Sequence, residues 1–546
     1  MITFDFDRGT QAIINKHYAV EAPIAWKDWL KINSKEEYIE ACLRNSGLSD
    51  IDKLSERLKK ARTDSRELSV DKEQYLASTN SREPYIFCHT SGTTNNDPSA
   101  LKWFHISKTL IERLWAPGMR AIFESSGLDS RGSAVIFVPS RMLFDGINEY
   151  LGKSYISLYS SELSQRIVIS LIKPKSYVLY PYKDVYNLKV LDFILNMPRI
   201  SVISAPAATL LKWADITRLK SGINQFIANQ NKQNASILKE NQLFKFIEKE
   251  GIEKGVPLIQ KRLSEKISQA NVIFSISSLD EERWNLIRSF MKWEKGKERF
   301  TNLYVGSEIG PFASSLPLEG YEISRTNKMY VFPLTVPVIQ YKNEMDLITE
   351  FEHSEGRLLI SRAHNGTPLV NIDTGDIISI KGHNSLPLIG GDIYRGEFTL
   401  NYEIYINQKI KTPSNYSISA GNYFTFQEFE IKDAYGLLDH LKQQCSLNSD
   451  SLVLNSWNKK KWQLYLPVSN GKCSSSEAVE EIVLNNLNEA TLSHALKNQM
   501  IDIVPLTEPL VDFISPRDEV LQKVREGKSP KGILKKWPLY VIKPKH

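Results

Sequence analysis

The chain has 546 residues, of which 42% are hydrophobic and 24% are charged. A chain of this length exceeds one compact core, so we expect a large domain and at least one smaller domain. The 69 Lys and Arg residues exceed the 63 Asp and Glu residues by only six. Nucleic-acid binders show a stronger and more clustered basic excess, so we expect no nucleic-acid partner.

The cysteines and the chain start favour a cytoplasmic location. Cys42, Cys88, Cys445 and Cys473 lie far apart and form no CxxC pair. We therefore expect free thiols in a reducing compartment, without a disulfide framework or a zinc site. The start, "MITFDFDRGT", carries acids where a secretory signal needs a basic and then an apolar run. No uninterrupted apolar stretch approaches the length of a membrane span, so we expect no membrane partner.

The sequence pattern of the first part of the chain predicts helices, followed by a layered α/β domain. Residues 1–80 form a helical lead-in, in which Ser34 and Glu37 have the spacing of a capping box. From about 85 to 210, the strand-like runs "AVIFVP", "SYVLYP" and "ISVISAP" alternate with helical segments. Such alternation is typical of α/β layers. Residues 216–266 are polar and helix-forming, and we interpret them as a surface insertion.

The pattern of strand-like and helical runs changes after about residue 390. The runs "YFTFQEFEI" and "KWQLYLPV" and the helical "SSEAVEEIVLNNL" suggest a compact α+β unit. We therefore predict an α/β protein with two domains. A large domain of mixed sheets and helices covers residues 1–395, and a small α+β domain covers residues 396–546.

A polar stretch follows the apolar run "YIFC". In "HTSGTTNNDP", hydroxyl residues flank one glycine; the stretch contains Thr90, Ser91, Gly92, Thr93 and Thr94. It is either a solvated turn or a loop whose N–H and hydroxyl groups surround an anion. Taken alone, it leaves both interpretations open.

Three later stretches add to this pattern. In "NLYVGSEIG", Tyr304 could stack on a base and Glu308 could hold a hard cation, although a strand end is the alternative. In "DTGDI", Asp376 stands in a predicted turn and could accept the hydroxyls of a ribose, although a capped hairpin is the alternative. In "REGKSPKG", Gly527 and Lys528 occupy a predicted loop near the chain end.

In this order, the four stretches resemble the adenylate-forming superfamily of acyl-CoA ligases, luciferases and peptide-synthetase adenylation domains. "TSGTT" resembles its phosphate loop, "YVGSE" its Tyr-Gly-x-Ser/Thr-Glu motif, "DTGD" its Thr-Gly-Asp motif and "EGKSPK" its catalytic-lysine loop. The phenylacetate-CoA ligase branch is the most similar, since "GNYFTFQEFE" resembles its stretch at the start of the small domain. The resemblance covers residues 85 to 536.

The resemblance implies an activity and a set of site residues. A carboxylate attacks the α-phosphorus of ATP, giving an acyl-adenylate and pyrophosphate, and a thiol or amine then displaces AMP. Lys528, Glu308 and Thr93 are the implied catalytic residues, with Mg²⁺ on Glu308. The implied ATP-binding residues are Thr90, Ser91, Gly92, Thr93, Thr94, Tyr304, Ser307, Glu308, Asp376 and Lys528.

Some positions depart from the family pattern. The phosphate loop continues as "NNDPS", where the family has Gly-x-Pro-Lys, and "IGGD" offers Asp392 as the hinge acid. Phe144 and Asp145 lie where the family lines its acyl pocket. If Asp145 anchors an amine, the substrate is an amino acid. If it caps a loop instead, an aryl or aliphatic acid is expected.

We therefore expect an AMP-forming acid–thiol ligase that acts on a small carboxylic acid with ATP and Mg²⁺. Coenzyme A is the favoured acceptor, and the phosphopantetheine of an acyl-carrier protein or an amine is the alternative. A non-catalytic nucleotide-binding homologue is the hypothesis from another class. The resemblance further implies that the small domain moves between an adenylating pose and a transfer pose.

Overall fold

A computed structural model describes much of the chain. The described residues are 4–5, 24–32, 34–48, 85–89, 103–138, 148–150, 152–157, 160–230, 238–273, 281–301, 303–306, 310–314, 328–352, 355–364, 367–379, 395–397, 400–402, 417–419, 423–426, 429–445, 447, 451–458, 461–467, 473, 475–484, 490–506, 516–528 and 538–542.

A six-stranded parallel sheet lies at the centre of the larger part of the molecule. Its strands, in spatial order, are β1 (Phe4–Asp5), β7 (Ser176–Pro181), β4 (Ser133–Val138), β8 (Ile200–Ser204), β9 (Asn271–Ile273) and β10 (Phe300–Thr301). All neighbouring pairs are parallel. Parallel strands are usually covered on both faces, and this explains their nearly continuous apolar sequences.

The central strand β4 separates two hydrophobic cores. Ala134, Ile136 and Val138 pack into one core, whereas Val135 and Phe137 pack into the other. Successive side chains of a strand point to opposite faces, so the run "AVIFV" supplies both cores at once. All six residues of β4 are buried.

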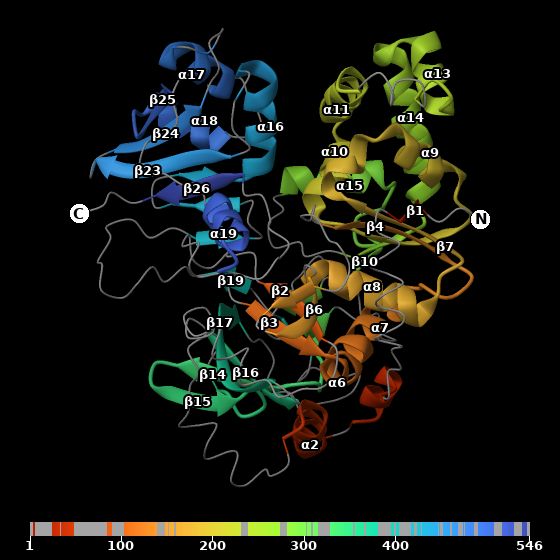
Figure 1. Ribbon diagram of the computed structural model, residues 1–546, viewed down its shortest axis with the longest axis vertical. Coiled ribbons are helices and arrows are strands. Elements are labelled where there is room, and N and C mark those ends of the chain that lie inside the picture. Colours follow the sequence, from red (N-terminus) through yellow and green to blue (C-terminus); the bar gives the residue numbers. More distant parts are fainter. Residues whose placement is uncertain are drawn as a thin grey trace.

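Helices cover both faces of this sheet, as Figure 1 shows. Core residues of α7 (Ala116–Ser125) and α8 (Ser160–Ile172) belong to the core of Ile136. The core of Phe137 takes residues from a larger set of helices: η4 (Tyr182–Tyr186), α9 (Leu188–Asn196), α10 (Ala207–Ala214), α11 (Ile216–Ala228), α13 (Gln242–Glu250), α14 (Ile252–Ile267) and α15 (Glu281–Phe290). Helices α11, α13 and α14 fall in the polar stretch 216–266. Their residues Leu219, Ile247 and Leu263 are fully or almost fully buried in this core.

Two antiparallel sheets and one mixed sheet form the other half of the larger part. One sheet has the order β15 (Glu344–Leu347), β14 (Val336–Tyr341), β16 (Glu355–His364), β17 (Thr367–Ser379) and β19 (Leu400–Tyr402). Another has the order β11 (Leu303–Gly306), β12 (Gly310–Ser314), β13 (Lys328–Val331) and β18 (Arg395–Glu397). A third contains β3 (Trp103–Ser107), β2 (Tyr85–His89), β6 (Lys153–Ser157) and β5 (Asn148–Tyr150).

Helical segments near the start of the chain pack against these sheets. The expected cap is confirmed: Ser34 precedes α2 (Lys35–Ser46), and its hydroxyl accepts a hydrogen bond from the Glu37 amide at 3.1 Å. The Tyr38 hydroxyl donates to the Val331 carbonyl at 3.1 Å, so α2 is tied to β13. The remaining segments here are η1 (Trp26–Lys31), α6 (Lys108–Leu110) and the π-helical η3 (Ile111–Trp115).

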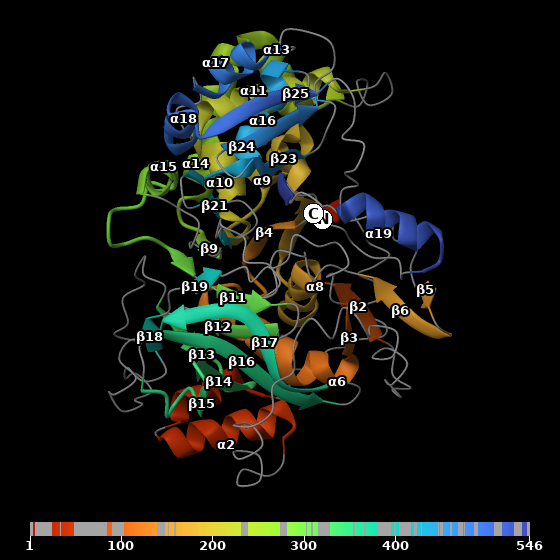
Figure 2. The same ribbon diagram turned by 90° about the vertical axis from the view of Figure 1, so that its left-hand side faces the viewer.

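The carboxyl-terminal part has a core of its own. Its strands form one sheet of β20 (Ser417–Ser419), β21 (Tyr423–Thr425) and β22 (Glu430–Ile431), and a second of β25 (Ile501–Leu506), β24 (Lys461–Pro467), β23 (Leu452–Asn458) and β26 (Leu539–Ile542). Its helices are α16 (Ala434–Cys445), α17 (Ser476–Leu484), α18 (Ala490–Lys497) and α19 (Pro516–Arg525). The buried residues of this core run from Phe424 to Val541. Figures 1 and 2 show this unit beside the helices of the parallel-sheet layer.

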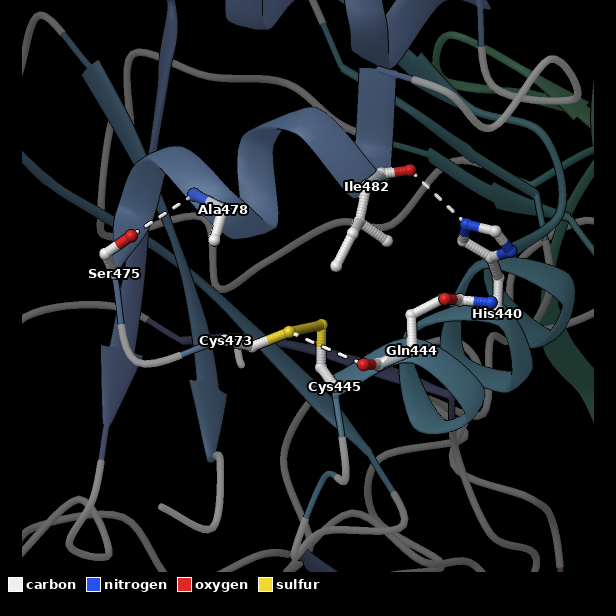
Figure 3. The surroundings of a disulfide bond; sticks show 7 residues. All are labelled: His440, Gln444, Cys445, Cys473, Ser475, Ala478 and Ile482. Carbon is white, nitrogen blue, oxygen red and sulfur yellow. Dashed lines mark hydrogen bonds between the residues drawn. A yellow bond between two sulfur atoms is a disulfide. The ribbon is translucent and has the colours of Figure 1, made fainter. Parts of the chain in front are cut away.

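The prediction of four free thiols is wrong for two cysteines. Cys445, at the end of α16, forms a disulfide with Cys473, and their Cα atoms lie 5.2 Å apart (Figure 3). Cys42 and Cys88 are free and buried. A separation of 28 residues carries no pairing signal, because folding alone brings the end of α16 to the segment that precedes α17. Among the described helices, none is both long enough and apolar enough to cross a membrane.

Replacing Cys473 by serine should destabilise the carboxyl-terminal part. A disulfide that closes a loop of this size stabilises a domain by about 3 kcal/mol, mainly by restricting the unfolded chain. Urea unfolding followed by tryptophan fluorescence, to which Trp462 in this core contributes, measures the loss. The same urea titration of the parent under dithiothreitol should shift equally, and an unchanged midpoint in both experiments would contradict the bond.

Candidate functional site

The predicted phosphate loop connects two paired strands. Strand β2 ends at His89, which lies opposite Trp103 at the start of the antiparallel strand β3. Strand β2 also pairs in parallel with β6 on its other side. The two described residues that flank 90–102, His89 and Trp103, therefore lie at paired positions of one sheet. Thr90, Ser91, Gly92, Thr93 and Thr94 themselves lie outside the described residues.

Buried polar groups lie behind β2. In α8, Arg166 Nε donates to Glu162 Oε1 at 2.9 Å, and both side chains are fully buried. Burial raises the pKa of the Cys88 thiol well above its usual range, and the nearby Glu162 carboxylate raises this pKa further. A thiol with a raised pKa is a poor nucleophile, so Cys88 is a packing residue of β2.

Tyr304 lies in a hairpin of strands β11 and β12. Gly306 pairs with Gly310, so Ser307 and Glu308 belong to the three-residue connection between the strands, which is outside the described residues. Gly310 has a φ of +63°, the left-handed conformation that commonly closes a three-residue hairpin. The Tyr304 ring is 6% exposed and meets Phe312 edge to face, with centroids 5.2 Å apart.

Asp376 lies inside a strand and not in a turn, so the turn predicted for "DTGDI" is wrong. On β16 and β17, Arg357 pairs with Ile377 and Leu359 pairs with Asp373. One residue of β16 therefore faces three residues of β17, which makes a β-bulge at 374–376. The Thr374 hydroxyl donates to the Leu358 carbonyl at 2.9 Å and fixes this bulge. The side chain of Asp376 is not among those described. Bulges are frequent beside active sites, where they redirect a side chain.

Sequence reasoning missed the support of this bulge. Asp373, the first acid of "DTGD", accepts a hydrogen bond from Arg357 Nη1 at 2.8 Å. The two side chains are 8% and 18% exposed, so solvent screens this ion pair less than one on the surface. In the sequence, only the position of Asp373 beside the Thr-Gly-Asp motif could have indicated this ion pair, because its partner Arg357 lies on a different strand.

Lys528 follows the carboxyl end of α19 directly. The Lys528 amide donates to the Lys523 carbonyl at 2.8 Å, and the Gly527 amide donates to the Val524 carbonyl at 3.1 Å. Gly527 has a φ of +68°. These features define a Schellman motif, in which the glycine takes the left-handed position that ends a helix. The lysine is therefore held at a helix end, where the sequence indicated a loop.

The Lys528 side chain extends into solvent. Its Nζ lies 2.9 Å from Glu526 Oε2, and the two side chains are 72% and 37% exposed. Hydrogen bonds from Lys528 and Gln522 lower the pKa of the Glu526 carboxyl group. An exposed pair of this kind contributes little to stability, so the ammonium can leave Glu526 at small cost.

The arrangement brings the end of α19 toward the sheet of β2. Both views show α19 close to the sheet formed by β2, β3 and β6, although the last of these strands ends at Ser157 and α19 begins at Pro516. The segment after Lys528 returns to β26, which pairs in parallel with β23. Phe144, Asp145 and Asp392 lie outside the described residues. Within the described part of the chain, no group of three metal-ligating side chains occurs.

No family model and no curated protein matches the chain. Solved structures of adenylate-forming enzymes do resemble it. A 2-hydroxyisobutyryl-CoA ligase in the postadenylation state, in complex with 2-HIB-AMP, is 11% identical, covers 96% of this chain and 93% of its own, and has a TM-score of 0.41. The GH3.15 acyl acid amido synthetase is 13% identical, with coverages of 96% and 100% and a TM-score of 0.44.

A third solved structure is McyG A-PCP complexed with phenylalanyl-adenylate. It is 12% identical, covers 82% of this chain and 67% of its own, and has a TM-score of 0.40. These similarities are distant, so the functional assignment depends on the residues of this chain.

Replacing Tyr304 by alanine should destabilise the protein. Removing a buried ring leaves a cavity beside Phe312, and such truncations cost roughly 3–5 kcal/mol. Replacement by phenylalanine keeps the ring and should cost less than about 1.5 kcal/mol. Urea unfolding of both variants measures the difference. Equal losses in the two variants would show that the hydroxyl group, and not the packing of the ring, stabilises this hairpin.

Proposed function

We propose that the protein activates a small carboxylic acid with ATP, forms an acyl-adenylate with release of pyrophosphate, and transfers the acyl group to a thiol. Coenzyme A is the favoured acceptor, and a carrier-protein phosphopantetheine or an amine is the alternative. The single observation that carries this proposal is the position of Lys528. An exposed ammonium follows a firmly capped helix close to the strand that precedes the hydroxyl-rich loop.

The hydroxyl-rich loop suits a polyphosphate. Pyrophosphate leaves with several negative charges, so the site needs donors that are oriented before the reaction. Thr90, Ser91, Thr93 and Thr94 supply hydroxyl groups, and Gly92 allows the backbone to approach closely. The pairing of His89 with Trp103 supports this role, because it fixes both ends of the loop at one edge of a sheet.

Two further elements would hold the nucleoside. Tyr304 would lie beside the adenine site, and Asp376 would accept the ribose hydroxyls. The bulge at 374–376 supports this role for Asp376, since it interrupts the regular alternation of β17 at that residue. Glu308, with Ser307 beside it, would hold Mg²⁺ through its carboxylate, the donor type that this cation prefers. The ion would neutralise charge on the phosphates.

Lys528 would stabilise the charge that develops between the carboxylate and the α-phosphate. A lysine suits this role, because its ammonium is a compact charge on a flexible stem with three donors. Leaving Glu526 costs little, as described above. The carboxyl-terminal domain, whose described core begins at Phe424, would carry this ammonium into the site for adenylation and withdraw it for transfer, with Asp392 as the hinge acid.

Replacing Lys528 by alanine should lower ATP–pyrophosphate exchange by roughly 10²–10³-fold, the cost of removing one donor to a developing charge. Transfer of a preformed acyl-adenylate to the thiol should be less affected. Lys297→Ala is the matched control, because Lys297 is also exposed and pairs with a nearby glutamate, Glu294. Unchanged exchange in Lys528→Ala would refute the assignment. A loss in Lys531→Ala instead would move the role to Lys531, the second lysine of "EGKSPK".

The substrate can be found directly. The protein is incubated with ATP and Mg²⁺ and with pooled amino, aryl and aliphatic acids, and the adenylate is identified by mass. We expect pyrophosphate release with one acid class, and an amino acid would support Asp145 as the anchor of an amine. Adding coenzyme A, a phosphopantetheinyl carrier or an amine then identifies the acceptor. Nucleotide binding without any pyrophosphate release would favour a non-catalytic nucleotide-binding homologue.

A further inference from the structure

Charged groups join the carboxyl-terminal domain to the larger domain. Asp433 precedes α16 in the carboxyl-terminal domain, and its Oδ2 lies 2.7 Å from Nη1 of Arg218 in α11. Asp215, the cap of α11, approaches Nε of Arg218 at 3.2 Å from the other side. A second pair crosses the same boundary, with Lys212 Nζ 3.7 Å from Asp439 Oδ2.

Asp433 has two functions at this boundary. Its Oδ1 accepts a hydrogen bond from the Gly436 amide at 2.9 Å, so the carboxylate caps the amino end of α16. Its Oδ2 faces Arg218. Burial alone would raise the pKa of Asp433, but Arg218, Arg283 and the Gly436 amide outweigh it and lower the pKa to about 2. The carboxylate is therefore charged although its side chain is only 2% exposed.

Glycine is required next to this pair. A Cβ at Gly436 would overlap the Asp433 carboxylate and would lie 2.8 Å from Nη2 of Arg218. A second glycine is packed tightly in the larger domain, since a Cβ at Gly222 would lie 2.5 Å from carbons of the Tyr186 ring. Lys212 Nζ lies 5.6 Å from the centre of that same ring, so the ion pairs and the aromatic packing form one continuous contact.

The hydrophobic cores do not cross this boundary in the described part of the chain. The core of Phe137 ends at Phe300, and the carboxyl-terminal core begins at Phe424. A polar contact between two separate cores can open and become hydrated, whereas a continuous apolar core cannot. The attraction of a buried ion pair is also largely offset by its dehydration, so such a contact can be specific without being strong.

We infer that Arg218, Asp433 and Gly436 form a latch that holds the carboxyl-terminal domain in the described pose, and that this latch opens when the domain changes pose. The contacts among Arg218, Asp433 and Gly436 support the latch itself. Its catalytic consequence rests on the proposed function, because Lys528 belongs to the same domain and moves with it. Opening the latch would therefore change which of the two half-reactions the enzyme is poised to perform.

The position of the domain can be measured without any substrate. Cysteines introduced at Lys249 in α13, which is 82% exposed, and at the exposed Glu477 in α17 carry spin labels on the two sides of the boundary (Figure 1). The native thiols of Cys42 and Cys88 are buried, and burial raises their pKa, so they react slowly with the label. Pulsed electron resonance then gives the distribution of label distances.

Removing either charge should shift that distribution toward separated domains. We expect Arg218→Gln and Asp433→Asn each to change the docked-to-undocked ratio by roughly 5- to 150-fold. Asparagine is as good a helix cap as aspartate, so Asp433→Asn leaves α16 intact. Arg131→Gln is the matched control, because Arg131 pairs with Asp129 at 2.9 Å on the open surface.

Gly436→Ala separates the latch from helix stability. Alanine favours helices over glycine by about 1 kcal/mol, which offsets the loss of the Asp433 cap, so the stability of α16 should change little. The added methyl group nevertheless displaces the Asp433 carboxylate, so the distance distribution should shift as it does in Asp433→Asn. Unchanged distributions in Asp433→Asn and Gly436→Ala, with native circular dichroism, would overturn the latch.

Kinetics test the catalytic consequence separately. In Asp433→Asn, ATP–pyrophosphate exchange and acyl transfer should change by different factors, because the two poses serve different steps. Equal losses in both steps would indicate a purely structural role and overturn this part of the inference. If the parent protein shows no adenylation with any acid, the proposed function fails, and the distance measurement still decides the latch.

Discussion

The burial of both faces of β4 is the constraint on which the larger domain depends. Its alternate side chains enter two different cores, so neither core can form unless this strand is in register with β7 and β8. Strand β2 belongs to a neighbouring sheet but adds Ile86 and Cys88 to the same core as Ile136. The base of the hydroxyl-rich loop is therefore supported by the same packing as the central sheet.

The carboxyl-terminal domain follows a different principle. Its core closes on itself between Phe424 and Val541, with a disulfide that joins the end of α16 to the segment before α17. Its described ion pairs with the larger domain involve Asp433 and Asp439. Strong apolar cohesion within each domain and polar contact between them are what a movable domain requires, because motion then leaves both cores intact.

Part of this structure could be predicted from local sequence. The capping box at Ser34 was predictable because its partners lie three residues apart, and strands β4, β7 and β8 were predictable from continuous apolar runs, whereas β1 lies in the stretch 1–80 predicted to be helical. The helix end at Gly527 was also readable in principle, since glycine after a basic last turn is a stop signal. We predicted a loop there, because proximity to the chain end outweighed that signal.

Features that join distant segments could not be predicted. The bulge at Asp376 depends on the register of β16, the pairing of Cys445 with Cys473 depends on where α16 ends in space, and the partner of Asp433 lies 215 residues earlier. No local pattern specifies such partners. The proposed site depends on the order of the four motifs more than on any one of them, because that order constrains the whole chain at once.

The pairing of β26 with β23 has a consequence for how far the ammonium of Lys528 can travel. Helix α19 precedes Lys528 and strand β26 follows it, so elements of the carboxyl-terminal domain flank the lysine on both sides. In the proposed reaction, a large displacement of this charge would therefore require rotation of the whole carboxyl-terminal domain.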